Sequence, residues 1–383
     1  MNKDEVDILK VTTDYKKYFL NLICNFIYHL GFADCWYEKR EIRYPIMNKL
    51  LSIIANIFCV IFVLNDLAAN FRTDLTYKEN NDLLIFNFGY TAIILKVVIL
   101  YVKRKHIRVF FKNLLENVQD LDRKAERFPI LVHVPFFFAL TSTTVQLFVG
   151  IKDYYEKGIP IRIEVLFYPK ASDIGIFVNF IRFLAICHVW YMICILTSTN
   201  YLCLCTLVSV KYKFTKVRVY FENLGKTPKN SEQFEEEFLA GVKLHQYALW
   251  CARNVQNTIG SISSVQIFES LSLLVACLLR AIVSYLFKNY IKSECISLTF
   301  NYISKLKCIF LQAQQISTAI FHSGWENVQV RPGLRKLIVV TLQQCQKPVC
   351  LTAFGVFDLS YTNFITILRS SYSFFVVMRD FNK

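Results

Sequence analysis

The chain has 383 residues and a formal net charge of +15; 54% of its residues are apolar and only 19% are charged, against roughly 25% charged in ordinary soluble domains. A soluble protein with so much Leu, Ile, Val and Phe would expose large apolar patches. The composition also excludes a disordered chain, a collagen, a coiled coil and a small disulfide scaffold, and it leaves a polytopic membrane protein.

Seven apolar stretches are each close to the ~20 residues that cross a bilayer as a helix. The fourth is too long for one span, so we expect it to continue beyond the membrane as a single helix. The sixth is the weakest because it contains Lys305 and Lys307. The stretches lie at 46–64, 83–102, 130–150, 174–208, 263–287, 294–316 and 353–378.

Basic residues alternate between the loops. The segments before the first span and after the second, fourth and sixth contain 28 Lys and Arg, whereas the segments on the other side contain 10. Because basic residues collect in the cytosol, the N-terminus is predicted to be cytosolic and the C-terminus extracellular, the reverse of a G-protein-coupled receptor. Asp4, Glu5 and Asp7 agree with this, since they interrupt any secretory signal. The net positive charge does not indicate nucleic-acid binding, because the sequence contains no basic block interleaved with aromatic residues.

Signatures of catalysis, cofactors and metals are missing from the sequence. It has no Walker loop, dinucleotide glycine pattern, H-E-x-x-H or G-x-S-x-G, so an enzyme is not expected. The six His are scattered, and His188 in the fourth span is interpreted as a pocket or packing residue rather than a metal ligand. The Cys spacings do not suit zinc. No internal repeat supports a secondary transporter.

The segment 209–262 is the largest one between spans. Ser231 is predicted to begin a helix because acids occupy the first turns after it. Five residues fall on one helical face, which we expect to pack against neighbouring helices. They are Leu239, Val242, Gln246, Leu249 and Arg253.

The last 65 residues contain the most specific motifs. An aromatic-x-Ser-x-Trp turn is formed by Phe321-His-Ser-Gly-Trp325. A basic helix with Arg335 and Lys336 follows, and Pro348 then precedes the segment Thr352-Ala-Phe-Gly355. The final span contains Leu359-Ser-Tyr-Thr-Asn-Phe364 and a Ser-Tyr-Ser at 371–373. With these motifs the chain resembles the insect odorant receptor family. Leu244-His-Gln246 and Lys96 also match positions of that family.

The resemblance implies an all-α polytopic membrane protein in which residues 1–383 form a single domain of seven transmembrane helices with inverted topology. It implies ligand-pocket spans within 46–208, cytosolic anchor helices at 209–262 and 317–352, and a pore helix at 353–378. By this resemblance the protein would be a subunit of a ligand-gated non-selective cation channel. The channel would be a heteromeric tetramer formed with the odorant co-receptor. The expected place is the plasma membrane of an olfactory sensory neuron.

The last span also has a pattern of its own. At ~100° per residue, four hydroxyl residues and two apolar residues share one ~100° stripe. Such a stripe can pack against another helix through hydrogen bonds or line a water-filled pore with an apolar gate; the resemblance favours the pore. The stripe consists of Thr362, Thr366, Ser370, Ser373, Val377 and Phe381, and Arg369 lies beside it.

Aromatic residues of spans two, three, four and six predict a pocket for a small volatile odorant, recognised by shape and dispersion. Each of them could equally be a packing residue. The predicted set is Phe86, Tyr90, Thr144, Phe148, Phe183, Tyr191 and Tyr302.

Two alternatives stay open at this stage. A gustatory receptor shares the topology but has a T-Y-x-x-x-x-x-Q-F motif in its last span, which this chain lacks. A secondary transporter would need repeat symmetry and coupled midplane charges. The odorant co-receptor itself shares Gln343-Gln-Cys-Gln-Lys347 but has a longer second cytosolic loop, so the resemblance is to a tuning receptor that binds odorants.

Overall fold

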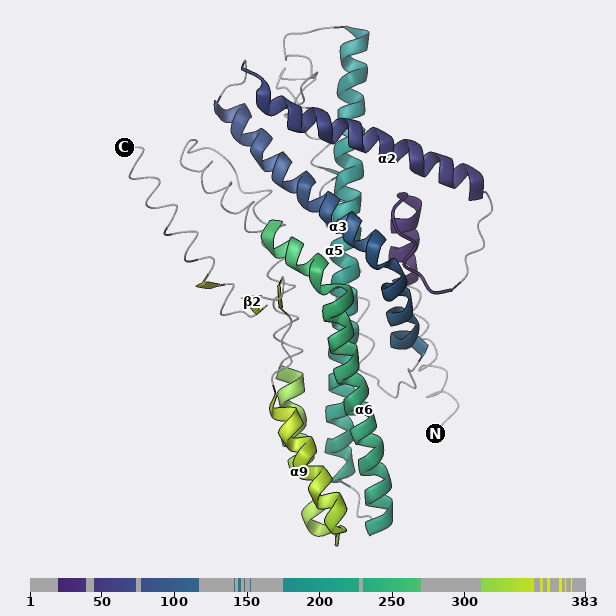
Figure 1. Cartoon of the computed structure of the whole chain (residues 1–383), viewed down its shortest axis with the longest axis vertical. Helices are drawn as coiled ribbons and strands as arrows, with labels where there is room; N and C mark the ends of the chain where they lie inside the picture. Colours follow the sequence, from purple (N-terminus) through teal and green to yellow (C-terminus); the bar gives the residue numbers. More distant parts are fainter. Residues whose placement is uncertain are drawn as a thin grey trace.

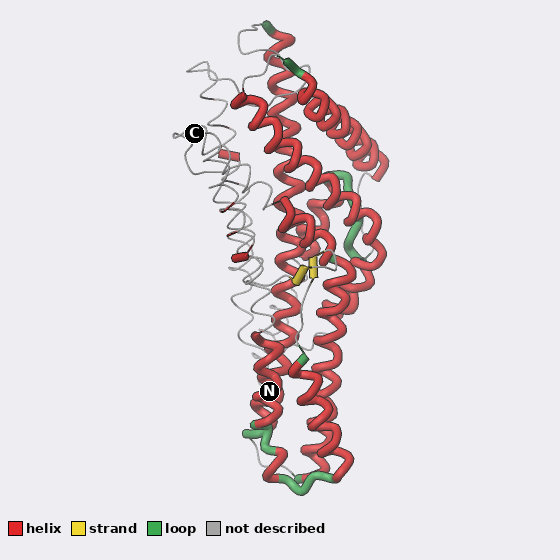
Figure 2. Tube along the Cα trace, turned by 60° about the vertical axis from the view of Figure 1, so that its left-hand side comes forward, coloured by secondary structure: helices red, strands yellow, loops and turns green. Residues whose placement is uncertain are grey.

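The computed structural model describes residues 20–38, 45–73, 77–116, 175–226, 230–269 and 311–347, and single positions at 141, 144–145, 148, 152, 352–353, 357–358, 365–366, 369 and 373. The described helices form one elongated bundle (Figures 1 and 2). Residues 20–29, 260–269 and 311–321 are helical. The remaining elements are α2 (Pro45–Ala68), η1 (Ala69–Phe71), α3 (Tyr77–Glu116), α5 (Ile176–Leu224), α6 (Ser231–Thr258), η3 (Trp325–Asn327), α9 (Pro332–Gln346), β1 (Thr352–Ala353) and β2 (Phe357–Asp358).

Helix α5 runs along almost the whole length of the bundle (Figure 1). Its 49 residues extend for about 73 Å at 1.5 Å per residue, more than twice the ~30 Å thickness of a bilayer core. The prediction that the stretch 174–208 belongs to one continuous helix too long for a single span is therefore confirmed. The predicted stretches 46–64 and 83–102 lie within α2 and α3.

Two of the described helices are long and apolar enough to cross a membrane, Pro45–Phe71 and Ile176–Leu224. On α2 the exposed apolar side chains recur every three or four residues and so form one face. A continuous exposed apolar face on a long helix is suited to contact with lipid. This face contains Leu50, Ile54, Ile57, Ile61 and Leu64.

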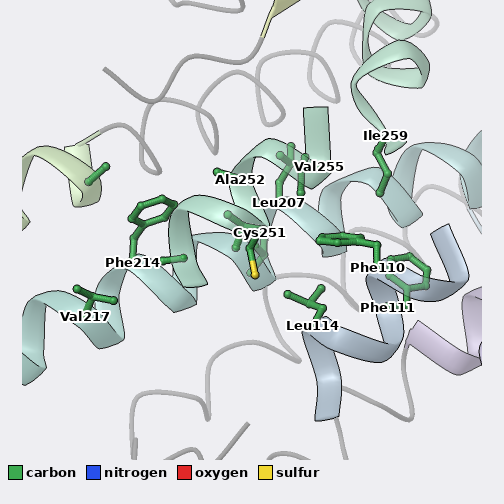
Figure 3. Packing of buried hydrophobic residues seen from close by; sticks show 14 of the residues in the cluster. Phe110, Phe111, Leu114, Leu207, Phe214, Val217, Cys251, Ala252, Val255 and Ile259 are labelled. Carbon is green, nitrogen blue, oxygen red and sulfur yellow. The ribbon is translucent and has the colours of Figure 1, made fainter. Parts of the chain in front are cut away.

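The main core lies where α3, α5 and α6 meet (Figure 3). Phe110 and Phe111 of α3, Phe214 of α5 and Cys251 and Val255 of α6 are almost completely buried in it. Helices α5 and α6 run side by side and make the most extensive contact between two elements of the described chain.

Helix α6 begins at Ser231 as predicted, but of the face predicted to pack only Val242 is buried. Leu239 is 40% exposed, whereas the buried face contains Phe234, Phe238, Gly241 and His245. The reason is the small residue Gly241, where an added Cβ atom would lie 2.7 Å from the Phe221 ring of α5. The two helices approach most closely along this line of α6, so its neighbours become buried.

The helix predicted at 353–378 begins later than predicted. Strands β1 and β2 pair antiparallel, with Thr352 opposite Asp358 and Ala353 opposite Phe357. The helix therefore begins after Asp358, and its described residues 365–366, 369 and 373 are helical.

Candidate functional site

A group of aromatic side chains surrounds His188 where α2, α3 and α5 meet. The His188 ring stacks on Phe62 of α2, with ring centroids 5.0 Å apart and an interplanar angle of 25°. The Tyr90 ring of α3 lies 5.3 Å away and the Phe58 ring of α2 lies 6.3 Å away. His188 and Tyr90 are buried. We call these four residues the His188 cluster.

The apolar part of this region continues from the His188 cluster along the same three helices. Cys59 and Val63 of α2, Ile93 of α3 and Met192 of α5 form one buried group with Tyr90. Asp66, one helical turn from Phe62, is buried as well. The site is thus mainly aromatic and aliphatic, with a few polar groups, which is the composition of a pocket for a small organic molecule.

The predicted pocket residues do not all lie in this cluster. Tyr90 belongs to it. Tyr191 is half-buried and donates a hydrogen bond to the Leu30 carbonyl, so its hydroxyl is directed to the segment after helix 20–29. Phe148 and Phe183 are 65% and 60% exposed and lie on the surface of the described chain.

Three further predicted positions are less well defined. Thr144 accepts a hydrogen bond from the Trp190 indole of α5 at 3.4 Å. Phe86 lies within α3, but its side chain is outside the described part. Tyr302 lies outside the described residues. The aromatic residues of α2 were absent from the predicted set, because its residues were chosen from spans two, three, four and six, although the range 46–208 includes the first span.

A second polar group lies deeper in the bundle. The Lys96 ammonium of α3 forms an ion pair with Glu269 and donates hydrogen bonds to Gln266 and to Asn200 of α5, the last at 3.0 Å. All four residues are buried, and Lys96 has no exposed surface. Ionisable residues within membrane segments are rare and usually functional or paired. Here the pairing joins α3, α5 and the helix at 260–269.

The last span is linked to α6 through one side chain. Gln256 donates from Nε2 to the Thr352 carbonyl at 2.9 Å and accepts from the Thr352 backbone N–H at 3.0 Å. This two-way contact resembles a rung of a β-sheet and fixes the chain just before the last helix. Thr366, Arg369 and Ser373 are exposed on that helix. The other predicted pore residues, Thr362, Ser370, Val377 and Phe381, lie outside the described residues.

His245 of α6 and Cys345 of α9 form a buried pair outside the predicted spans. The Cys345 Sγ lies 3.7 Å from the His245 Nε2. Burial lowers the pKa of His245 to about 4 and raises the pKa of Cys345 to about 12. Both groups are therefore uncharged near neutral pH, and the thiol lacks the thiolate character that a nucleophile or a metal ligand needs.

Comparison with protein families gives a match over residues 76–372, to the model described as 7tm Odorant receptor. The match covers α3, α5, α6, α9 and most of the predicted last span. The chain belongs to this odorant receptor family. Odorant receptors are multi-pass membrane proteins and not enzymes, so the predictions of a membrane receptor and of no enzymatic activity are confirmed.

Individual relatives agree with the family assignment. Odorant receptor 59b of Drosophila melanogaster is 27% identical over 84 residues, which is 22% of this chain and 21% of that receptor. The structure of the insect olfactory receptor OR5 from Machilis hrabei superposes with a TM-score of 0.74 at 11% identity, covering 96% of this chain and 98% of that one. The structure of the same receptor in complex with eugenol superposes with a TM-score of 0.74 at 10% identity, covering 95% of this chain and 98% of that one. The odorant receptor fold thus extends over almost the whole chain, and the predicted all-helical, seven-transmembrane fold is confirmed.

Proposed function

We propose that this odorant receptor is the odorant-binding subunit of a heteromeric, ligand-gated, non-selective cation channel that acts in olfactory detection. The observation that carries the proposal is the family match, which extends to residue 372 and so includes most of the predicted pore helix 353–378. Its partner would be the odorant co-receptor in a hetero-oligomer, a tetramer. The assembly would lie in the plasma membrane of an olfactory sensory neuron.

The ligand in this proposal is a small volatile odorant. The receptor from Machilis hrabei has been solved in complex with eugenol, which supports a small organic molecule as the ligand of this chain. The His188 cluster offers such a molecule aromatic surface from α2 and α3. A ligand can favour the open channel only by the difference between its affinities for the open and closed states, so the site must change shape when the pore opens.

The connection from site to pore would use α5 and α6. Helix α5 contains His188 and continues beside α6, and Gln256 near the end of α6 holds the start of the last span. The exposed hydroxyl residues Thr366 and Ser373 then lie on the surface of one subunit, where they are accessible to line a pore between subunits. The predicted anchor helices 209–262 and 317–352 would hold the subunits together on the cytosolic side.

The experiment is current recording from cells that express this chain with the co-receptor, the co-receptor alone, or this chain alone, against a broad odorant panel. We expect some odorants to evoke current only when both chains are present. A chain truncated at Pro348, which lacks the last span, should give no such current at matched surface expression. Transport of solute without conductance would contradict the channel, and full responses without the co-receptor would contradict the heteromer.

The proposed orientation has its own test. With a cytosolic N-terminus, an epitope placed before Asp4 should be protected from antibody in intact cells, whereas one after Lys383 should be labelled. Labelling of the N-terminal epitope in intact cells would reject the inverted topology.

A further inference from the structure

His188 is a buried polar residue whose ring forms no hydrogen bond within the described part of the chain. Its side chain is 1% exposed, and within the described residues neither Nδ1 nor Nε2 has a hydrogen-bond partner. Its ring contacts the rings of Phe58, Phe62 and Tyr90. Buried polar atoms in proteins are nearly always hydrogen-bonded, and an exception needs an explanation.

Packing alone does not explain a histidine at this position. A Leu or Phe would fill similar space between the rings of Phe58 and Phe62 without the cost of burying two unpaired nitrogen atoms. A metal does not explain it either, because the described residues contain no group of three His, Cys, Asp or Glu that could hold an ion. Within the part of the chain that the structure describes, the explanation left is a partner from outside it, namely the ligand.

The chemistry of the ring defines which ligands would fit. An uncharged imidazole has one donor nitrogen and one acceptor nitrogen. It can donate to a carbonyl oxygen, or it can accept from a hydroxyl group. The surrounding aromatic faces contact carbon skeletons through dispersion, so the complementary molecule is apolar except for one oxygen group.

We propose that His188 determines specificity by hydrogen-bonding the hydroxyl or carbonyl oxygen of an alcohol, aldehyde or ketone odorant, against hydrocarbons of the same skeleton. The proposal rests on the proposed function, because it assumes that the His188 cluster forms part of the odorant site. It adds the chemical class of the ligand and the residue that selects it. A site that hydrogen-bonds a ligand oxygen rejects the analogue without it, since the polar group of the protein is then left unpaired.

The test uses the full receptor expressed with the co-receptor and sets of odorants with one carbon skeleton: octanol, octanal and octane, and phenylethanol, phenylacetaldehyde and ethylbenzene. Wild type should respond to the oxygen-bearing members at lower concentration than to the hydrocarbon. His188→Leu should raise the half-maximal concentration for the oxygen-bearing members about tenfold, the value of one hydrogen bond, and leave the response to the hydrocarbon unchanged. His188→Gln, which keeps a donor and an acceptor, should retain most of the preference.

The matched control is Phe177→Leu, on the same helix but 73% exposed, outside the cluster and outside the predicted pocket set; it should leave every ratio of half-maximal concentrations unchanged. Two results would overturn the role of His188: equal half-maximal concentrations for wild type across a set, or a surface-expressed His188→Leu receptor with the wild-type ratio. The first result decides the question even if neither His188 variant reaches the surface. Failure of the proposed function gives a different result, namely no odorant-evoked current from wild type at all.

Discussion

The Lys96 ammonium is held by the Glu269 carboxylate and by the side-chain oxygens of Gln266 and Asn200. Burying two charges costs several kcal/mol per ion, and their attraction and hydrogen bonds recover about that amount. The pair therefore adds little net stability, but each charge depends completely on the other. Its main effect is to fix the positions of α3, α5 and the helix at 260–269 relative to one another.

Removing one charge of this pair should be strongly destabilising. Lys96→Met or Glu269→Leu alone leaves an uncompensated buried charge, and each should lower the free energy of unfolding by about 3–5 kcal/mol. The double variant should lose less than either single variant, because no charge is then left unpaired. Thermal unfolding in detergent measures the stability of the two single variants and the double variant. Lys105→Met, at an exposed position, is the control. Additive losses would show that the two charges do not depend on each other.

Acid should weaken the contact between α6 and α9 through His245. The imidazole faces Cys345 and is buried, which lowers its pKa from 6.5 to about 4. The unfolded chain binds a proton at this residue below about pH 6.5, whereas the folded chain does so only near pH 4. The free energy of unfolding should therefore fall as the pH decreases from 6.5 to 4, with about 2 kcal/mol lost from this group at pH 5.

The measurement is the unfolding midpoint of the purified receptor at pH 7.5 and pH 5. In His245→Leu the difference between the two midpoints should become smaller. Val242→Ala removes buried side-chain volume from the same face of α6 and should lower both midpoints while leaving their difference as in wild type. An unchanged difference in His245→Leu would mean that other groups cause the acid sensitivity.

Single residues were only partly predictable from the sequence. Tyr90 was predicted as a pocket residue, and it lies in the His188 cluster; Lys96 was recognised as matching a family position. The ion-pair partner of Lys96 could not be inferred, because Glu269 lies 173 residues further along the chain and no local sequence pattern relates the two residues. The same limit applies to Phe62 and His188, which come together only when α2 and α5 cross.

At the scale of whole elements, apolar length predicted α2, α3 and α5 well, because a stretch of some 20 apolar residues has few alternatives to a helix in a membrane. The buried face of α6 was predicted only in part, since Val242 is buried but Leu239 is exposed. Apolar residues occur on several sides of this helix, and Gly241, which lets α5 approach, adds nothing to a hydrophobic pattern. The strand pair before the last helix was also missed, since each strand has only two residues.

The contact between α5 and α6 gives a prediction of opposite effects at two glycines in helices. In Gly241→Ala the new Cβ would lie 2.7 Å from the buried Phe221 ring, so the helices must separate, and the free energy of unfolding should fall by about 1–3 kcal/mol. Gly333→Ala in α9 meets no atom within 4 Å and should be neutral or stabilising by up to about 1 kcal/mol, the helix propensity gain. Thermal unfolding of both variants is the measurement. A neutral Gly241→Ala would show that α5 and α6 tolerate a wider separation.

In the proposed channel the pore would belong to the whole assembly, since each subunit would contribute one last span to it. The sequence predicted the hydroxyl stripe from helical periodicity, but periodicity cannot tell a surface facing water from one facing another helix. Of the stripe, Thr366 and Ser373 lie in the described part and are exposed on the single chain. This exposure fits both a pore lining and a contact between subunits, so the choice depends on a measurement of gating.

Val377 provides that measurement. It shares the stripe with the hydroxyl residues but is apolar, which suits a constriction that excludes water from the closed pore. Val377→Ser keeps a similar size and adds a group that hydrates a narrow pore, so we expect a higher current in the absence of odorant when the variant is expressed with the co-receptor. Phe375→Ser, on the opposite face of the helix by the same periodicity, should instead reduce expression without raising this basal current. In the proposed heteromer the co-receptor would contribute unchanged helices to the gate, which would limit the increase to part of the odorant-evoked level. Equal basal currents in wild type and Val377→Ser at matched surface expression would place this face against protein rather than water.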